Sequence, residues 1–357
     1  MDASCSAAST GAALPLSSEA SACPSVSIVL AVRNEERHVE RCLRGIFAQN
    51  YPHDRLEVIV ADGLSTDATR EIVAHLSADS DSPVRLLLNS KLGRAQGLNL
   101  AIGACTGDLV VRVDARSILA PDYVSRCVRT HAETAAWNVG GTLKPLSEGL
   151  TQKAIGLALS HPFGVGNAQY RLGRKSGFVD QVYLGCYPRA VFDRIGLFDE
   201  TPSVISEDSD INQRIWAGGG KVYLNSEIVT LYVPRESFSD FWKLYFRYGG
   251  ARAGNFLKHG SLTSWRQAVS PAALLLGVVT FLFAAFGNRL AVNFLGVLLA
   301  MYVVTDISVA WSLARLEKEK GLFWRLLPVF PCMHLAWALG FWARVLIPER
   351  PGRYWSN

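Results

Sequence analysis

The sequence predicts an α/β domain with an open sheet, followed by membrane-spanning helices near the C-terminal end. Between residues 26 and 113, short apolar segments rich in Val, Ile and Leu alternate with helical patterns. No Asp, Glu, Lys or Arg occurs in residues 267–288. Of the 357 residues, 19% are charged and 49% are hydrophobic, against about 25% charged in an average soluble domain. The scarcity of charge favours a soluble domain joined to a membrane part.

The first half of the α/β domain is expected to contain four strands with helices between them. The strands are predicted at residues 26–32, 56–61, 84–88 and 108–113. The helices are predicted to begin at residues 34–36 and to cover 68–76 and 93–103. Polar residues follow Val32, Ala61 and Val113. Ligands of open α/β sheets bind beyond the carboxyl ends of strands, so a site is expected there.

Three apolar segments, at residues 269–287, 290–313 and 326–343, predict membrane spans. A helix needs about 20 apolar residues to cross a hydrocarbon core near 30 Å thick. Buried core helices are the alternative reading. The third segment contains Pro328 and Pro331, so a re-entrant or interfacial segment is an alternative there.

The distribution of basic residues predicts the orientation of these spans. The loop between the second and third segments carries Arg315, Lys318, Lys320 and Arg325. The loop between the first two carries only Arg289. By the positive-inside rule the more basic loop is cytoplasmic, and so is everything before the first span. Arg350 and Arg353 in the tail oppose this assignment.

The N-terminal residues and the overall charge exclude several classes of protein. Residues 1–24 are rich in Ser and Ala and lack Lys and Arg, which predicts a disordered leader and not a secretory signal. The net charge of +5 gives no indication of a nucleic-acid partner. Seven cysteines without a CxxC pair favour reduced thiols over a disulfide framework or a zinc site.

Polar motifs occur in a fixed order along the chain. They include Arg33-Asn34-Glu35-Glu36, Asp62-Gly63-Leu64-Ser65-Thr66-Asp67, Val113-Asp114-Ala115-Arg116, Ser206-Glu207-Asp208 and Tyr245-Phe246-Arg247-Tyr248-Gly249. Together they resemble the family 2 glycosyltransferases, and within them the succinoglycan-type (ExoA-like) exopolysaccharide glucosyltransferases, over about residues 25–260. The resemblance implies a GT-A fold, a nucleotide-sugar donor, a divalent metal, inversion at the anomeric carbon and a lipid-linked saccharide acceptor.

The resemblance implies that Asp208 is the catalytic base. In an inverting transfer, the acceptor hydroxyl loses a proton as it attacks, and one carboxylate within hydrogen-bond reach suffices. The alternative is that the acids around Asp208 only cap a helix expected at residues 211–217. Asp210 is expected to be solvated on that helix.

The predicted metal ligand is Asp114, which follows the strand ending at Val113. Mg²⁺ and Mn²⁺ prefer oxygen ligands and bridge diphosphate oxygens. The family pattern is Asp-x-Asp, often Asp-Ala-His in the nearer subfamily, whereas this chain has Arg116 at the third position. Arginine cannot ligate a metal. Either Asp114 holds Mg²⁺ or Mn²⁺ with waters and donor phosphates, or Arg116 supplies part of the positive charge.

Seven residues are predicted to bind the donor. They are Glu35, Asp62, Arg94, Asn99, Arg116, Arg247 and Arg252. The resemblance implies that Asp62 reads the base and that Glu35 lines the nucleoside pocket. The alternative for Asp62 is that its side chain only stabilises the turn, or caps the helix, that follows the strand. The alternative for Glu35 is that it is only a first-turn acid favoured by the helix dipole. The basic, aromatic segment around Arg247 also reads as an interfacial helix on a bilayer.

These inferences combine into one expected organisation. A GT-A domain is expected at residues 25–235, an interfacial amphipathic segment at 236–266, two to three transmembrane helices at 267–347 and a tail at 348–357. The expected function is transfer of a hexose, glucose from UDP-glucose, to a polyprenyl-linked saccharide on the cytoplasmic side of the inner membrane. A polyprenyl-phosphate glycosyl synthase, or a catalytically weakened scaffold in a polysaccharide assembly complex, is the alternative.

Overall fold

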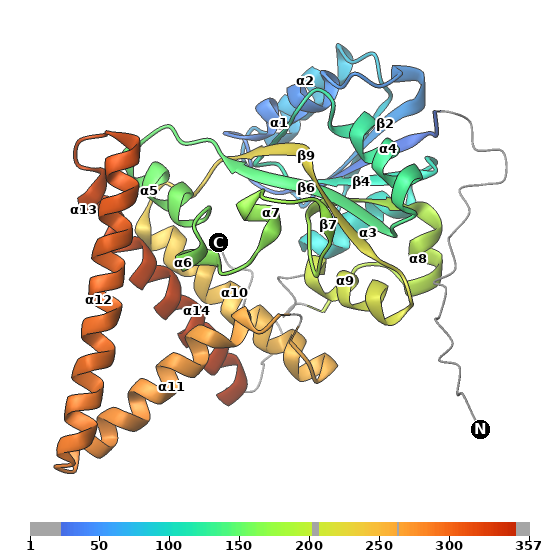
Figure 1. The fold of residues 1–357 in the computed structure, drawn as a ribbon. Helices are drawn as coiled ribbons and strands as arrows, with labels where there is room; N and C mark the ends of the chain where they lie inside the picture. Colours follow the sequence, from blue (N-terminus) through green and yellow to red (C-terminus); the bar gives the residue numbers. More distant parts are fainter. Residues whose placement is uncertain (1–22, 202–206, 263, 348–357) are drawn as a thin grey trace, which may run out of the picture.

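A computed structural model describes residues 23–201, 207–262 and 264–347 (Figure 1). Most of the expected leader, the expected tail at 348–357 and Ser206 lie outside the described residues.

One mixed sheet of nine strands forms the centre of the α/β domain (Figure 1). The strands are β1 (Val26–Val32), β2 (Leu56–Asp62), β3 (Val84–Leu88), β4 (Leu109–Val113), β5 (Ser117–Leu119), β6 (Asn138–Pro145), β7 (Gly177–Phe178), β8 (Tyr183–Pro188) and β9 (Val222–Tyr232). Their order is β3-β2-β1-β4-β8-β6-β9-β5, with β7 paired to β9. β1 to β4 are parallel to one another, and β8 runs antiparallel to β4. The four predicted strands are confirmed.

Helices cover both faces of the sheet. On one face lie α1 (Val39–Phe47), α2 (Thr69–Ala78) and α4 (Tyr123–Thr134). On the other lie α3 (Arg94–Gly103), α8 (Arg189–Ile195) and α9 (Glu207–Ala217). Each set closes its own apolar core against the buried strands. The sheet therefore has the two covered faces that a parallel strand arrangement requires.

Helix α1 begins at Val39, later than the predicted 34–36. Asn34 has φ of 53°, a left-handed conformation that a right-handed helix excludes. Its side-chain oxygen accepts a hydrogen bond of 2.9 Å from the Thr66 backbone N–H. Asn34 therefore ties the end of β1 to the turn after β2.

The C-terminal part is helical. Its elements are α10 (Phe238–His259), α11 (Arg266–Ala285), α12 (Arg289–Glu317), α13 (Leu322–Leu326) and α14 (Val329–Leu346), and they pack with α5 (Leu150–Ala158) and α6 (Pro162–Val165). Three described helical segments are long and apolar enough to cross a membrane: Arg266–Ala285, Arg289–Glu317 and Leu322–Leu346. Pro328 and Pro331 fall at the start of α14, where a missing backbone N–H costs little. Pro331 therefore does not interrupt α14, whereas Pro328 lies in the short turn between α13 and α14.

The three apolar segments differ in how much protein covers them. The apolar windows of α11 and α12 are only 11% and 6% buried, whereas that of 322–346 is 44% buried. α14 packs along α10, and at Gly249 and Gly340 the two backbones touch. A Cβ added at Gly249 would collide with the Trp337 carbonyl oxygen, and one at Gly340 with that of Phe246. α11 and α12 extend away from the domain (Figure 1).

The end of α12 returns to the α/β domain. Lys153 of α5 forms ion pairs of 2.9 Å with Glu317 and 2.6 Å with Glu319. The basic loop that follows α12 therefore lies on the same side as the α/β domain, whereas the α11–α12 turn lies at the far end (Figure 1). This arrangement agrees with the predicted topology, in which the loop and the domain share one side of the membrane.

Candidate active site

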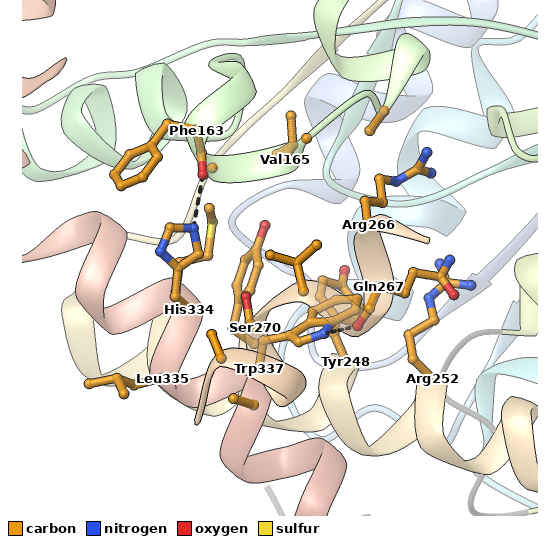
Figure 2. A pocket seen from close by; sticks show the side chains of 18 of the residues that line it. Phe163, Val165, Tyr248, Arg252, Arg266, Gln267, Ser270, His334, Leu335 and Trp337 are labelled. Carbon is orange, nitrogen blue, oxygen red and sulfur yellow. Dashed lines mark hydrogen bonds between the residues drawn. The ribbon is translucent and has the colours of Figure 1, made fainter. Parts of the chain in front are cut away.

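A cavity of about 1190 Å³ connects the carboxyl end of β4 with the C-terminal helices. Its charged lining residues are Arg94, Arg112, Asp114, Arg171, Asp208, Arg252 and Arg266. The remainder of the lining includes many apolar residues of α11, α12 and α14. Figure 2 shows Arg252 and Arg266 on one side and His334 and Leu335 on the other. The cavity thus has a charged part and an apolar part.

Four charged side chains form a cluster at the end of β4. Glu207 lies 2.9 Å from both Arg94 and Arg112, and Arg112 lies 3.1 Å from Asp114. Arg112 and Glu207 are buried. Burial alone would raise the pKa of Asp114, but Arg112 and Arg94 outweigh it and hold that pKa below its usual range. The cluster therefore keeps Asp114 ionised.

Arg112 is absent from the residues predicted from sequence. It interrupts the otherwise apolar strand Leu109–Val113. A charged side chain within a buried strand requires a counter-charge, which Glu207 and Asp114 supply. An arginine within an otherwise apolar strand was therefore the sequence signal that could have identified Arg112 as a candidate site residue.

Asp208 lies in the first turn of α9 and lines the cavity. Its Oδ2 accepts a hydrogen bond of 2.6 Å from Gln181 Nε2. Gln181 Oε1 in turn accepts one of 2.8 Å from Arg252, which also donates to Ser209. Arg252 and Gln181 therefore fix the position of the Asp208 carboxylate. Its catalytic role stays a prediction.

The expectation that Asp210 is solvated is wrong. Its side chain is fully buried and pairs with Arg214 at 2.8 Å, Lys258 at 2.7 Å and His259 at 2.9 Å. Lys258 and His259 end α10, which runs past α9 and supplies these partners. The ion pairs attach the helix that carries Asp208 to α10.

Replacing Asp210 with Asn is expected to destabilise the fold in a pH-dependent way. Burial would raise the pKa of Asp210, but Lys258, His259 and Arg214 together lower it. The stabilisation, about 2 kcal/mol for hydrogen bonds to a charged group, is thus present above the ordinary aspartate pKa near 4 and is lost as the pH falls through the folded-state value. Thermal melting should show a difference between parent and Asp210→Asn that is large at pH 7 and shrinks below about pH 4. A difference that is the same across this range would contradict the assignment.

Glu35 and Arg116 pair with each other. Arg116 Nε lies 3.4 Å from Glu35, whereas Asp114 is contacted by Arg112. Burial raises the pKa of Glu35, although Arg116 and Arg235 act in the opposite direction.

Two further donor-binding candidates make local hydrogen bonds. Asp62 is fully buried, accepts from the backbone and hydroxyl of Ser65 at 2.9 and 2.5 Å, and lies 3.8 Å from Arg70. Asn99 bonds both backbone groups of Phe198. Both side chains thus have structural roles, and their donor-binding roles stay predictions.

Of the nine predicted site residues, the described cavity lining brings together Arg94, Asp114, Asp208 and Arg252, and it also includes Arg112. It does not include Glu35, Asp62, Asn99, Arg116 or Arg247. Burial lowers the pKa of Arg247, and the charges of Arg94 and Arg235 lower it further.

The residues around Asp114 can supply few metal ligands. Within 23–201, 207–262 and 264–347, no group of three or more His, Cys, Asp or Glu side chains is arranged to hold a metal ion. Mg²⁺ in nucleotide enzymes is commonly bound through one or two carboxylates together with substrate phosphates and waters. Asp114 fits that limited role, with donor phosphates as the other ligands.

Comparisons with known proteins identify the α/β domain. A family model described as Glycosyl transferase family 2 matches residues 27–180. Succinoglycan biosynthesis protein ExoA of Rhizobium meliloti is 29% identical over 328 residues, covering 89% of this chain and 94% of that protein. The Methanococcus voltae dolichyl N-acetyl-alpha-D-glucosaminyl phosphate 3-beta-D-2,3-diacetamido-2,3-dideoxy-beta-D-glucuronosyltransferase is 25% identical, covering 64% and 72%.

A solved structure supports the fold. The mannosyltransferase PcManGT from Pyrobaculum calidifontis, in complex with GDP-Man and Mn²⁺, superposes with a TM-score of 0.64 at 20% identity, covering 92% of this chain and 88% of that one. The sheet is accordingly a GT-A fold followed by apolar helices, as predicted. The chain is therefore a glycosyltransferase that matches the glycosyl transferase family 2 model over residues 27–180 and is similar to ExoA over most of its length.

Proposed function

We propose that the protein transfers a hexose, glucose from UDP-glucose, with inversion to a hydroxyl of a polyprenyl-linked saccharide. The observation that carries this proposal is the single cavity that joins Asp114 and Asp208 to the apolar residues of α11, α12 and α14. A soluble sugar acceptor would not need an apolar wall built from helices that could span a membrane. A lipid-linked acceptor requires the charged part of the cavity for its saccharide and the apolar part for its lipid chain.

Asp208 is the proposed general base. As the acceptor oxygen forms its bond to the anomeric carbon, its proton passes to Asp208 and the bond from that carbon to the donor phosphate breaks. The bonding electrons leave with the nucleoside diphosphate. Gln181 and Arg252 hold the carboxylate toward the cavity.

The arginines of the cluster at β4 are expected to offset the negative charge of the departing nucleoside diphosphate. Arg94 lines the cavity and its side chain is 33% exposed, so it can turn from Glu207 toward a phosphate. A Mg²⁺ or Mn²⁺ ion on Asp114 would supply further neutralisation.

Chelation is expected to stop the transfer. Since Asp114 is the proposed metal ligand, EDTA should reduce incorporation by at least tenfold, and added Mn²⁺ or Mg²⁺ should restore it. The measurement is incorporation of labelled sugar with EDTA, followed by titration of each ion, with Ca²⁺ as the comparison ion. Activity that survives full chelation would show that arginines carry this charge without a metal.

The proposed location is the inner membrane with the GT-A domain in the cytoplasm. The names of two relatives support a lipid-linked acceptor and a polysaccharide product: one is a succinoglycan biosynthesis protein and the other acts on a dolichyl-linked sugar. The basic loop beside the α/β domain suits an anionic cytoplasmic leaflet.

A donor panel tests the proposal. Membranes containing the protein are incubated with radiolabelled nucleotide sugars and a lipid extract, and organic solvent then separates lipid from water. Label from UDP-glucose in the lipid fraction is the expected result, and label from another donor would correct the sugar. No transfer from any donor would favour a scaffold role.

A second candidate is transfer directly to polyprenyl phosphate. The observation that favours it is that the apolar wall reaches the charged residues in the same cavity. Its product would be a single sugar joined by an acid-labile phosphate bond, whereas the first candidate extends an oligosaccharide. Mild acid followed by sizing of the released sugar separates the two.

A further inference from the structure

We propose that Arg171 binds the phosphate group of a lipid-linked acceptor where the charged and apolar parts of the cavity meet. This inference rests on the proposed function, because it assigns a residue to recognition of the acceptor. Arg171 belongs to the short helix α7 (Gln169–Leu172), which lies between α6 and β7 in the chain.

The position of Arg171 follows from its neighbours. Its guanidinium carbon lies 5.4 Å from the centre of the Tyr170 ring, and the rings of Tyr245 and Tyr248 are nearby. Tyr245 also contacts Trp337 of the apolar helix α14, with ring centres 6.3 Å apart. Arg171 therefore lines the cavity together with a tyrosine that contacts the apolar helix α14.

On the other side, the same tyrosines lead to the reacting centre. Tyr248 packs against Tyr245, with ring centres 5.7 Å apart, and has Arg94 and Asp208 among its charged neighbours. Arg171, Tyr248 and Asp208 line the same cavity. A phosphate at Arg171 would have its lipid chain toward α14 and its sugar toward Asp208.

The charge balance of the cavity favours an anion at this point. Among the described lining residues there are five arginines and two aspartates. Arg94, Arg112 and Arg266 each pair with a carboxylate, and Arg252 with Gln181 and Ser209. In the part of the chain that the structure describes, no carboxylate forms an ion pair with Arg171, whose surroundings are aromatic.

Arg171 is half-buried, and a bound anion offsets the cost of taking a guanidinium out of water without a counter-ion. Arginine pairs with phosphate through two parallel hydrogen bonds, which a tyrosine-lined pocket strengthens by excluding water. The apolar residues beyond it, such as Leu274, Phe281 and Leu299, suit a hydrocarbon chain. A phosphate attached to a prenyl chain would pair with the Arg171 guanidinium and would also fill the apolar part of the cavity.

Equilibrium binding tests this assignment on the full chain in lipid nanodiscs. The probe is radiolabelled farnesyl diphosphate, with empty nanodiscs subtracted and with farnesol, inorganic pyrophosphate and UDP as competitors. Arg171→Gln is expected to weaken farnesyl diphosphate binding by roughly 10- to 100-fold, as for loss of a charged hydrogen bond. Arg171→Lys should recover part of the loss. UDP binding should be unchanged in both variants, which also shows that they fold.

The matched control is Arg174→Gln, an exposed arginine three residues away that is outside the described cavity lining; it should bind as the parent does. The assignment to an acceptor lipid is overturned if Arg171→Gln weakens UDP and not farnesyl diphosphate, because the residue then serves the donor. It is equally overturned if pyrophosphate competes as well as farnesyl diphosphate, or if the parent binds farnesol equally well. None of these binding results would contradict sugar transfer to lipid in the donor panel, so failure of this inference is distinguishable from failure of the proposed function.

Discussion

Asp208→Asn is expected to lower the turnover number by roughly 10²- to 10⁴-fold, the usual contribution of a general base. The amide keeps the size and hydrogen-bonding capacity of the carboxylate, so the KM for the donor should change little. The asparagine amide oxygen can still accept the hydrogen bond from Gln181 Nε2, so the bond from Arg252 to Gln181 Oε1 need not change. The measurement is initial rates over a range of donor concentrations.

Asp193→Asn is the matched control, because Asp193 is an exposed aspartate on α8. Its rate should equal that of the parent. A phosphate acceptor is already ionised and needs no base. Full activity of Asp208→Asn would therefore refute the base assignment and favour direct transfer to polyprenyl phosphate.

Glu207→Gln is expected to have the largest effect on stability. Glu207 is buried between Arg94 and Arg112, at 2.9 Å from each. Removing one partner of a buried ion pair commonly costs about 3–5 kcal/mol, because the remaining charge loses its counter-ion. This loss corresponds to a melting temperature lower by about 10 °C. Activity should fall as well, since Arg112 would then bind Asp114 alone.

The comparison variant is Glu133→Gln, whose side chain is exposed and lies 3.9 Å from Arg129. An exposed pair contributes about 0–1 kcal/mol, so its melting temperature should stay within about 2 °C of the parent. Melting is followed by the loss of helical circular dichroism in detergent. If both variants melt alike, the buried cluster does not stabilise the domain.

The sequence predicted the elements with strong local signals. Continuous apolar segments such as 26–32 read as buried strands, and the charge-free segment 267–288 read as a membrane helix, because each pattern is complete within a few residues. The order of the polar motifs placed Asp114 and Asp208 at one site, and both line one cavity. Asp114 follows the end of strand β4, whereas Asp208 reaches the same cavity from the first turn of helix α9.

Contacts between distant segments could not be predicted in this way. Asp210 looked like a surface residue because its partners Lys258 and His259 are 48 and 49 positions away and belong to another helix. Arg171 carried no motif, and its importance depends on tyrosines of α10 folding against α7. The start of α1 was placed too early because the conformation of Asn34 depends on a turn 32 residues away.

The glycine contacts between α10 and α14 have a consequence for which acceptors can react. Where backbones touch at Gly249 and Gly340, the helices have little freedom to slide or tilt. Asp208 is linked to α10 through Gln181 and Arg252, so its position relative to the apolar helix α14 is fixed by the packing of α10 on α14. Under the proposed function, a hydroxyl one sugar too near the lipid, or one too far from it, would not reach the Asp208 carboxylate. Chain length, and not only the identity of the terminal sugar, would then select the step at which this protein acts.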